Sequence, residues 1–456
     1  MIVSRSLLRL LLAAAALHLV SVITISFIGK QQILPHTFDQ SGIGTTFAVD
    51  STVYRYEAEA MAQLLQQGRL REWWNFGNRL RSSSHVRPYS ISFALVGKLS
   101  GYGILAAEPV NLCYYLAILV LTYAIGAEVF SQRVGLRAAT IVGLWPSLLL
   151  YSTQVLRDSL VIGANLLFIL GLLLCLKSAR SFAQAGGAAG MVAASLLILW
   201  LVRADGWEPL WLVLAIATVT CVFSQLKDRR FEYGKTIAFI AILLFAYWLP
   251  RALPTFRLVD LIEHQAQLNQ RSGEGAAAPF NTQLAETEAS WHKPVGRLAG
   301  KIGFLRHRFI IRYPMAGSNI DTNVELSSIG DIVRYLPRAV EIGFLAPFPN
   351  MWFARGAQVG KSGRVLVGGE MLVMYLIIAL MLLTLIHLWD NLMVWFLFAS
   401  AAAGCIALSL VVVNMSSLYR MRYPFFILLI ILGVQGWHIV RERFTSDRAA
   451  NAVALP

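Results

Sequence analysis

The sequence predicts an all-α polytopic membrane protein: a bundle of about ten transmembrane helices with two long external loops that carry interfacial helices. Three observations predict this fold class. First, 57% of the 456 residues are hydrophobic, only 14% are charged, and the mean hydropathy is +0.61. Second, several apolar runs are long enough for a helix to cross the hydrocarbon core of a bilayer. Third, the basic residues are distributed unequally between the segments that connect these runs.

Ten predicted spans account for the apolar runs. The first run follows Arg5 and Arg9, as a signal-peptide core would. It is longer than such a core and has no small-x-small cleavage site, so we expect it to be retained as a helix. The ten spans are residues 7–28, 108–130, 137–151, 159–176, 186–202, 207–224, 236–250, 366–388, 391–413 and 423–440.

The charges of the short connections predict the orientation of the chain. On the side of the N-terminus these connections carry thirteen Lys and Arg residues, and on the opposite side they carry four. This is the positive-inside bias, so we expect both termini in the cytoplasm. The four basic residues on the external side are Arg157, Arg203, Arg420 and Arg422.

Two stretches outside the ten spans are also apolar. The stretch 88–107 contains Lys98 and four glycine or proline residues, and counting it as a span would place the basic connections outside. We expect an interfacial helix there, with Pro88 in its first turn. Residues 329–346 predict an interfacial or re-entrant helix that ends before Pro347. The polar segment 263–294 is expected to be mobile.

This topology divides the chain into three parts. Residues 1–250 form an N-terminal transmembrane module whose first external loop, 29–107, is expected to be catalytic. Residues 251–365 form the second external loop, and residues 366–456 form a C-terminal transmembrane module with a short cytoplasmic tail.

All four cysteines lie in apolar runs, so we expect neither disulfides nor a cysteine metal site. The net charge of +14 is dispersed, which favours anionic membrane lipid or a phosphorylated substrate over nucleic acid as a partner.

The stretch 47–68, FAVDSTVYRYEAEAMAQLLQQG, follows the first span and predicts a helix at the membrane surface. Its apolar stripe, at spacings of three and four, is Tyr54, Ala58, Met61, Ala62 and Leu65. Asp50 or Ser51 is expected to cap this helix. A carboxylate at the membrane boundary is costly unless it has a partner or a task, so Asp50 is either a cap alone or a functional acid.

Four groups of polar residues are predicted on the external side of the bundle. They are Asp50 with Tyr54, then Arg157 with Asp158 in YSTQVLRDS, then Arg203 in LVRADGWEP, and finally Arg420 with Arg422 in SSLYRMRYP. Each group alone has a structural explanation, such as a helix cap or a side chain that reaches the lipid headgroups. Their presence on one side is what an active site at a membrane surface requires.

At these residues the sequence resembles the GT-C glycosyltransferases, which include protein O-mannosyltransferases and the bacterial aminoarabinose transferase of lipid A. The first match is D-x-x-x-Y-x-x-x-A, here Asp50, Tyr54 and Ala58. The second is WPSLLLYSTQVLRD at 145–158, and the third is RMRYP at 420–424. The resemblance covers the first four spans and, less fully, the last one.

The resemblance implies an enzyme of cell-envelope polysaccharide biosynthesis in the bacterial inner membrane. It would move a sugar from a polyprenyl-phosphate donor to a lipid, glycan or protein acceptor at the periplasmic face. Asp50 is the expected catalytic base. Asp158 is expected to orient the acceptor, hold an arginine, or share a cation with Asp50. Arginine suits a phosphate because its planar fork donates two parallel hydrogen bonds, so Arg420 and Arg422, and then Arg157 and Arg203, are the expected phosphate ligands.

Three questions stay open at the sequence level. Many class members have Asp-Glu at the first acid, whereas this chain has Asp50-Ser51, and two acids are too few to assign Mg²⁺ or Mn²⁺. An O-antigen-type polymerase or ligase is the alternative enzyme, and it would not depend on an acid directly after the first span. A transporter or flippase should carry ionisable residues at the bilayer midplane, whereas Lys98 and Glu370 lie near the edges of their apolar stretches.

Overall fold

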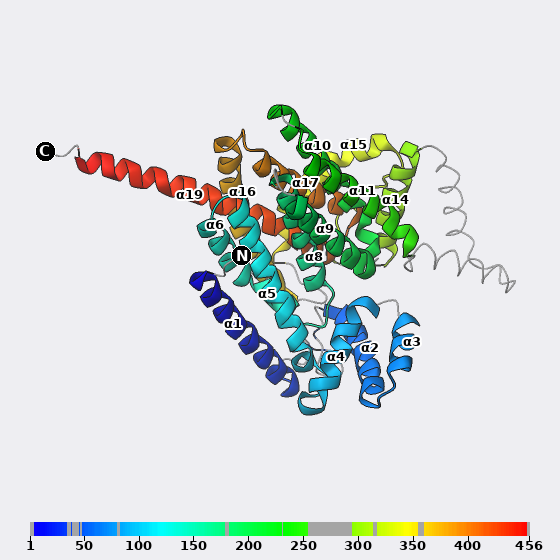
Figure 1. Cartoon of the computed structure of the whole chain (residues 1–456). Coiled ribbons are helices and arrows are strands. Elements are labelled where there is room, and N and C mark those ends of the chain that lie inside the picture. Colours follow the sequence, from blue (N-terminus) through cyan, green and yellow to red (C-terminus); the bar gives the residue numbers. More distant parts are fainter. Residues whose placement is uncertain are drawn as a thin grey trace.

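A computed structural model of the chain describes residues 4–33, 38, 45, 48–79, 83–177, 182–229, 231–253, 294–312, 317–353 and 360–453. Within these ranges the regular elements are helices, joined by turns and two isolated β-bridges (Figure 1). The predicted all-α class is therefore confirmed. Of the segment 263–294, which we expected to be mobile, only residue 294 lies within the described residues.

Nine of the described helices are long and apolar enough to cross a membrane, so the chain is an integral membrane protein. The remaining predicted span, 137–151, is bent: α6 (Gln132–Gly143) and α7 (Pro146–Ser152) meet at 67° and together pass the same test. Pro146 lacks the N–H that would continue the ladder of α6, and it starts the new helix. The other spans are α1 (Arg5–Lys30), α5 (Ile104–Val129), α8 (Asp158–Lys177), α9 (Phe182–Arg203), α10 (Trp207–Lys227), α11 (Tyr233–Ala252), α16 (Gly360–His387), α17 (Leu392–Val411) and α19 (Tyr423–Val453).

Small residues allow close contacts between the spans, as is common in membrane proteins. A Cβ atom on Gly126 of α5 would lie only 2.7 Å from the Cα atom of Gly135 of α6. The two helices therefore touch through their backbones. In the same way, Gly436 of α19 packs directly on the carbonyl of Leu380 in α16.

The first long connection contains three helices that do not qualify as spans: α2 (Val49–Gln66), α3 (Leu70–Arg79) and α4 (Ser83–Ser100). The apolar stripe predicted for α2 packs against α4, with Ala58, Met61 and Ala62 fully buried. The capping prediction was wrong. The helix begins one residue before Asp50, which lies in its first turn, and no side chain caps it.

The stretch 88–107 is divided between α4 and α5. Gly101 adopts a left-handed conformation, with φ of 79°, which ends α4 and redirects the chain. Because α4 begins five residues earlier than expected, at Ser83, Pro88 lies inside the helix and not in its first turn.

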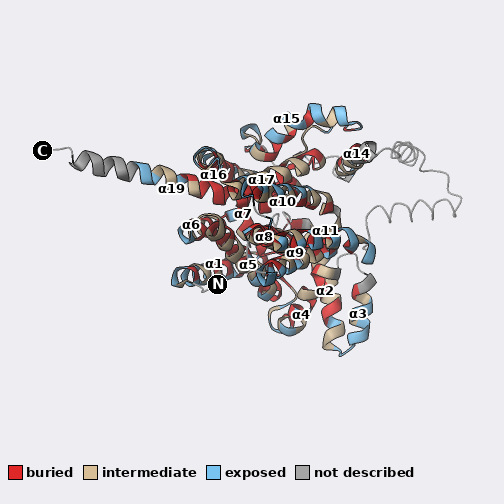
Figure 2. Cartoon of the chain, turned by 45° about the horizontal axis from the view of Figure 1, so that its top comes forward, coloured by how far each residue is buried: buried red, intermediate tan, exposed pale blue. Residues whose placement is uncertain are grey.

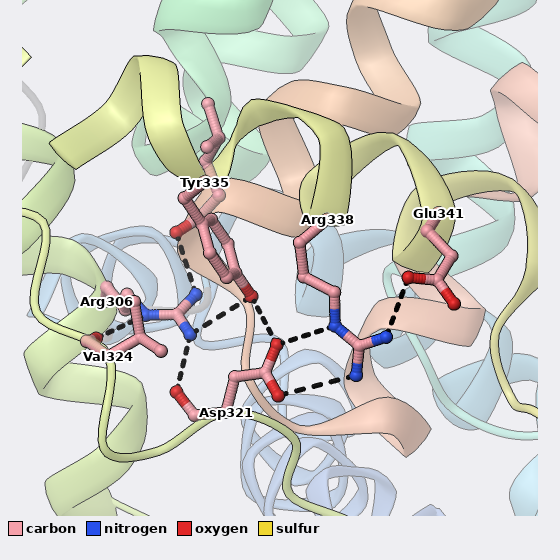
Figure 3. A network of polar contacts seen from close by, with 7 residues as sticks. Arg306, Asp321, Val324, Tyr335, Arg338 and Glu341 are labelled. Atoms are coloured by element: carbon pink, nitrogen blue, oxygen red, sulfur yellow. Dashed lines mark hydrogen bonds and ion pairs between the residues drawn. The ribbon is translucent and has the colours of Figure 1, made fainter. Parts of the chain in front are cut away.

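The second long connection contains α14 (Pro294–Arg312) and α15 (Ile329–Leu345), and α15 matches the helix predicted at 329–346. A network of polar contacts around the buried Arg306 holds both helices against the end of α17 (Figure 3). Arg306, only 2% exposed, donates to the carbonyls of Asp321, Val324 and Leu410. The Asp321 carboxylate accepts from Tyr335 at 3.0 Å and from Arg338 at 3.0 Å.

This anchored loop also touches the segment that leads to α18 (Met415–Met421). The amide of Ile320 donates to the carbonyl of Val413, and the amide of Met415 donates to the carbonyl of Ser318, each at 3.0 Å. Asn414 then caps α18, because its side chain accepts from the amide of Ser417. Two short 3₁₀ helices, η3 (Ala204–Gly206) and η5 (Pro349–Met351), complete the described elements.

The loop helices lie at the end of the bundle where α8 begins and α9 ends, which we call the loop end. In Figure 1 the C-terminal part of α19 projects to the left, whereas α2, α3, α4 and α14 lie on the right. Figure 2 shows that exposed residues are prominent on α3 and α15, while buried residues run along the spans. The two long connections therefore lie away from the C-terminal end of α19.

Candidate active site

Four of the predicted site residues form a cluster of charges at the loop end, here called the acid–arginine cluster: Asp50, Asp158, Arg203 and Arg420. Arg420 lies between the two acids, with Nη2 3.7 Å from Oδ2 of Asp50 and Nη1 3.3 Å from Oδ2 of Asp158. The other carboxylate oxygen of Asp158 is 4.0 Å from Nη1 of Arg203. These residues come from α2, α8, α9 and α18, so only the folded chain brings them together.

The α8–α9 pair positions one half of the cluster. Asp158 is the first residue of α8 and Arg203 is the last residue of α9. The two antiparallel helices pack closely, so these residues meet at the loop end. The position also suits both charges, because a helix favours an anion at its N-terminus and a cation at its C-terminus. Arg157 lies beside them and donates to the carbonyl of Val202 at 3.3 Å.

Packing of α2 and α4 on the turn before α8 brings Asp50 to the cluster. Val155, in that turn, is buried in the same apolar group as Met61 of α2 and Tyr89 of α4. The hydroxyl of Tyr89 donates to the carbonyl of Leu156 at 3.1 Å, which fixes α4 to the turn. The packing of the apolar stripe predicted from the sequence thus positions Asp50 at the cluster.

Tyr54 lies one turn after Asp50, next to the cluster. Burial raises the pKa of its hydroxyl, Arg157 opposes this shift, and the carboxylates of Asp50 and Asp158 add to it. The phenol is therefore protonated at neutral pH and can donate a hydrogen bond. The two acids differ in exposure: the side chain of Asp50 is 42% exposed and that of Asp158 is 15% exposed.

Arg422 does not join the other predicted site residues. It is 1% exposed, and its guanidinium donates to the carbonyls of Ile342 and Gly343 at 3.2 and 3.1 Å and also to that of Ala346. These carbonyls belong to the C-terminal end of α15 and its cap residue, where few backbone amides remain to donate: within the described residues, only the carbonyl of Ile342 also accepts from a backbone amide, that of Ala346. The structure therefore assigns Arg422 to the capping of α15 and separates it from Arg420.

Residues that the sequence analysis did not single out also lie at the site. His85 of α4 is buried, and its ring meets that of Tyr54 edge-on with 4.4 Å between the centroids. Burial lowers the pKa of His85 to about 3, and the positive charge of Arg157 contributes to this shift. Its only sequence signal is one polar residue at the start of an amphipathic stretch, which is too weak to identify a site.

Two buried polar groups link helices inside the bundle. Glu370 of α16 accepts from the amide and the hydroxyl of Ser147, at 2.7 and 2.6 Å, and from the hydroxyl of Tyr419 at 2.5 Å. It thereby ties α7 to α18, the helix that carries Arg420. His18 of α1 lies between Glu108, 2.8 Å from Nδ1, and Ser152, 3.0 Å from Nε2.

A largely apolar cavity of about 590 Å³ opens beside the cluster. Arg157 and Arg203 line it at the cluster, and Lys301 and Arg308 add positive charge from α14. Its other walls are apolar side chains of α10, α14, α15 and α17, among them Leu212, Phe309, Ile332 and Ile406. Lys301 also forms an ion pair with Glu208, which links α14 to α10.

The arrangement does not fit a metal ion held by both acids. A divalent cation of the Mg²⁺ type requires several oxygen ligands around one point. Here the guanidinium of Arg420 occupies the space between the carboxylates of Asp50 and Asp158. In the described part of the chain, no three His, Cys, Asp or Glu side chains converge as a metal site would require.

Comparisons with known proteins give a weak structural likeness. No family model and no curated protein matches the sequence. Among solved structures, the chain is similar to the archaeal oligosaccharyltransferase AglB from Archaeoglobus fulgidus, solved in complex with an inhibitory peptide and a dolichol-phosphate. The likeness has a TM-score of 0.42 and 12% identity, and it covers 82% of this chain and 44% of AglB. The chain thus spans less than half the length of that protein, and the likeness is too weak to assign a family.

Proposed function

We propose that this chain is a membrane glycosyltransferase of the GT-C type. It moves a sugar from a polyprenyl-phosphate donor to a lipid, glycan or protein acceptor at the outer face of the membrane. In a bacterium this would be the periplasmic face of the inner membrane, in cell-envelope polysaccharide biosynthesis. One observation carries the proposal: the acid–arginine cluster adjoins an apolar cavity whose end at the cluster is lined by arginines.

The shape and charge of this site match a lipid phosphate. An isoprenoid chain is apolar and suits the walls between α10, α14, α15 and α17. The phosphate would then lie near Arg157 and Arg203, with Arg420 close by. Arginine is suited to this role because its planar fork can donate two parallel hydrogen bonds to a phosphate.

The two acids take different roles in the reaction. Asp50 is the more exposed carboxylate, so an acceptor can reach it, and it takes the proton from the acceptor hydroxyl or amine. The acceptor atom forms a bond to the anomeric carbon of the sugar, and the bond from that carbon to the phosphate oxygen breaks. The leaving polyprenyl phosphate keeps the electron pair, and the arginines stabilise its charge. Asp158, between Arg203 and Arg420, holds both guanidinium groups in position.

The substitution Asp50→Asn tests this assignment. In proteoliposomes that contain lipid-linked sugars extracted from the native membrane, transfer should fall by about 10²-fold or more, the range for loss of a general base. Glu72→Gln is the matched control, because Glu72 lies on the exposed helix α3 and pairs with Arg69 alone in the described structure. Normal transfer by Asp50→Asn would reject Asp50 as the base and favour an O-antigen-type polymerase or ligase, which has no need of this acid.

A further inference from the structure

His85 is a buried titratable residue whose role the proposed chemistry leaves open. It is 3% exposed and belongs to the first turn of α4, where its ring meets Tyr54 edge-on. The Nε2 atom is buried and has no hydrogen-bond partner within the described structure. Buried polar atoms are nearly always paired in folded proteins, and each exception calls for an explanation.

The surroundings of His85 point toward the acid–arginine cluster. Arg157 and Asp158 are the two charged groups close enough to influence its pKa. Arg157 lines the cavity, and Asp158 contacts Arg203 and Arg420. The ring of His85 contacts that of Tyr54, which lies one turn after Asp50 on α2, so the unpaired nitrogen lies next to the cluster.

The chemistry of the ring indicates which part of a substrate it can recognise. With a pKa of about 3, the imidazole is neutral at physiological pH and has one N–H and one lone pair. A neutral ring adds no charge against a phosphate, and the arginines already supply that charge. A sugar hydroxyl both donates and accepts, so it can pair with either tautomer of the ring.

We propose that His85 is a substrate-contacting residue that hydrogen-bonds a hydroxyl group of the transferred sugar through Nε2. This inference rests on the proposed function, and it adds a residue that discriminates the donor's sugar from its phosphate. The sugar is bonded directly to the phosphate, so a phosphate held at Arg157 and Arg203 brings the sugar to the region between these arginines and Tyr54. The acceptor approaches Asp50, whose carboxylate is exposed.

Binding measurements with two kinds of lipid test the assignment. The full-length chain in nanodiscs is titrated with decaprenyl phosphate and with a panel of decaprenyl-phosphate hexoses. His85→Phe keeps an aromatic ring against Tyr54 but removes both nitrogens, whereas His85→Gln keeps a polar group near the position of Nε2. Ile91→Ala, at an exposed position of α4, serves as the control for changes in this helix.

We expect His85→Phe to weaken binding of the best hexose lipid by about tenfold, the loss of roughly one hydrogen bond. Its affinity for decaprenyl phosphate should stay within about twofold of the parent, and His85→Gln should recover part of the hexose affinity. Equal losses for both lipids in His85→Phe would overturn the inference, because His85 would then act on the phosphate or on packing. Unchanged affinity for both lipids would overturn it as well. A folded parent chain that binds no decaprenyl phosphate rejects the proposed function itself, which is a different result.

Discussion

Arg420 and Arg422 are separated by one residue and have opposite surroundings. Arg420 faces two carboxylates at the site, whereas Arg422 is buried against the C-terminal carbonyls of α15. In a helical segment, residues i and i+2 point about 200° apart, so they do not share a face. The same basic motif, RMRYP, therefore contains one residue of the candidate site and one residue of the fold.

Lysine substitutions should separate these two roles. Arg420→Lys keeps the charge but loses the planar fork, so donor use should weaken by about 1.5–3 kcal/mol while the melting temperature stays near that of the parent. Arg422→Lys puts a single donor nitrogen in place of the two guanidinium nitrogens that reach the carbonyls of Ile342, Gly343 and Ala346. At least one buried carbonyl then loses its side-chain donor, so the free energy of unfolding should fall by about 1–3 kcal/mol. Thermal melts and donor titrations on both purified variants provide the measurement. A stable, fully active Arg422→Lys variant would show that the cap is dispensable.

The sequence was informative at the residue scale wherever a residue followed a predicted span. Asp50, Arg157, Asp158, Arg203 and Arg420 each follow from the topology, and the structure places them at one end of the bundle. His85 could not be found in this way, because it reaches the site only when α4 packs on α2 and on the turn before α8. The burial of Arg422 likewise depends on the tertiary position of α15.

At the scale of elements, two short helices carry the residues around Arg420. The ring of Tyr151, on α7, lies 5.4 Å from the guanidinium carbon of Arg420, and α18 carries Arg420 itself. Glu370 bonds to both helices, through Ser147 and Tyr419. The orientation of Arg420 thus depends on a carboxylate inside the bundle that does not touch it.

Glu370→Gln should therefore disturb both the stability and the site. Four donors point at the Glu370 carboxylate: the amide and hydroxyl of Ser147, the hydroxyl of Tyr419 and the side chain of Trp145. The amide group of glutamine would therefore face at least one of them. We expect the free energy of unfolding to fall by about 1–3 kcal/mol and turnover per folded molecule to fall as well. Adding Tyr419→Phe removes one of the excess donors and should restore part of the stability.

A control on the same helix distinguishes positioning from simple destabilisation. Thr384→Val, also on α16, removes a single hydrogen bond to the carbonyl of Leu432 in the core of the bundle. It should lower stability by about 0.5–1.5 kcal/mol and leave turnover per folded molecule unchanged. If Glu370→Gln and Thr384→Val lower turnover to the same extent, Glu370 has no positioning role.

Hydrophobic patterning predicted which elements exist better than it predicted where they bend or begin. The ten apolar runs all correspond to helices of the structure, but the third run contains the 67° bend between α6 and α7. Pro146 indicates that bend, whereas its angle depends on the packing of α7 against its neighbours. The early start of α4 has a similar cause, because its first residues pack against α2: His85 on the ring of Tyr54, and Val86 in the apolar group around Met61.

At the scale of the whole molecule, both long connections return to the same end of the bundle. The first brings Asp50, Tyr54 and His85 to the cluster through α2 and α4. The second supplies α14 and α15 as two walls of the cavity, fixed by the buried Arg306. Composition and charge predicted this shared side, but the contacts between loops and spans depend on tertiary packing that no local pattern encodes.

The charge bias of the short connections predicts the orientation of the bundle, and this prediction is open to a direct test. Thr322 lies in the second long connection. Asp228 follows the C-terminal end of α10, which is the end away from the acid–arginine cluster. Both residues are exposed. Single cysteines are introduced at these positions after the four native cysteines have been replaced. We expect Thr322→Cys to react with an impermeant maleimide in intact spheroplasts, and Asp228→Cys to react only after permeabilisation, because the thirteen basic residues on the side of Asp228 predict that this side faces the cytoplasm. The reverse labelling would place the acid–arginine cluster in the cytoplasm and remove the proposed transfer from the outer face of the membrane.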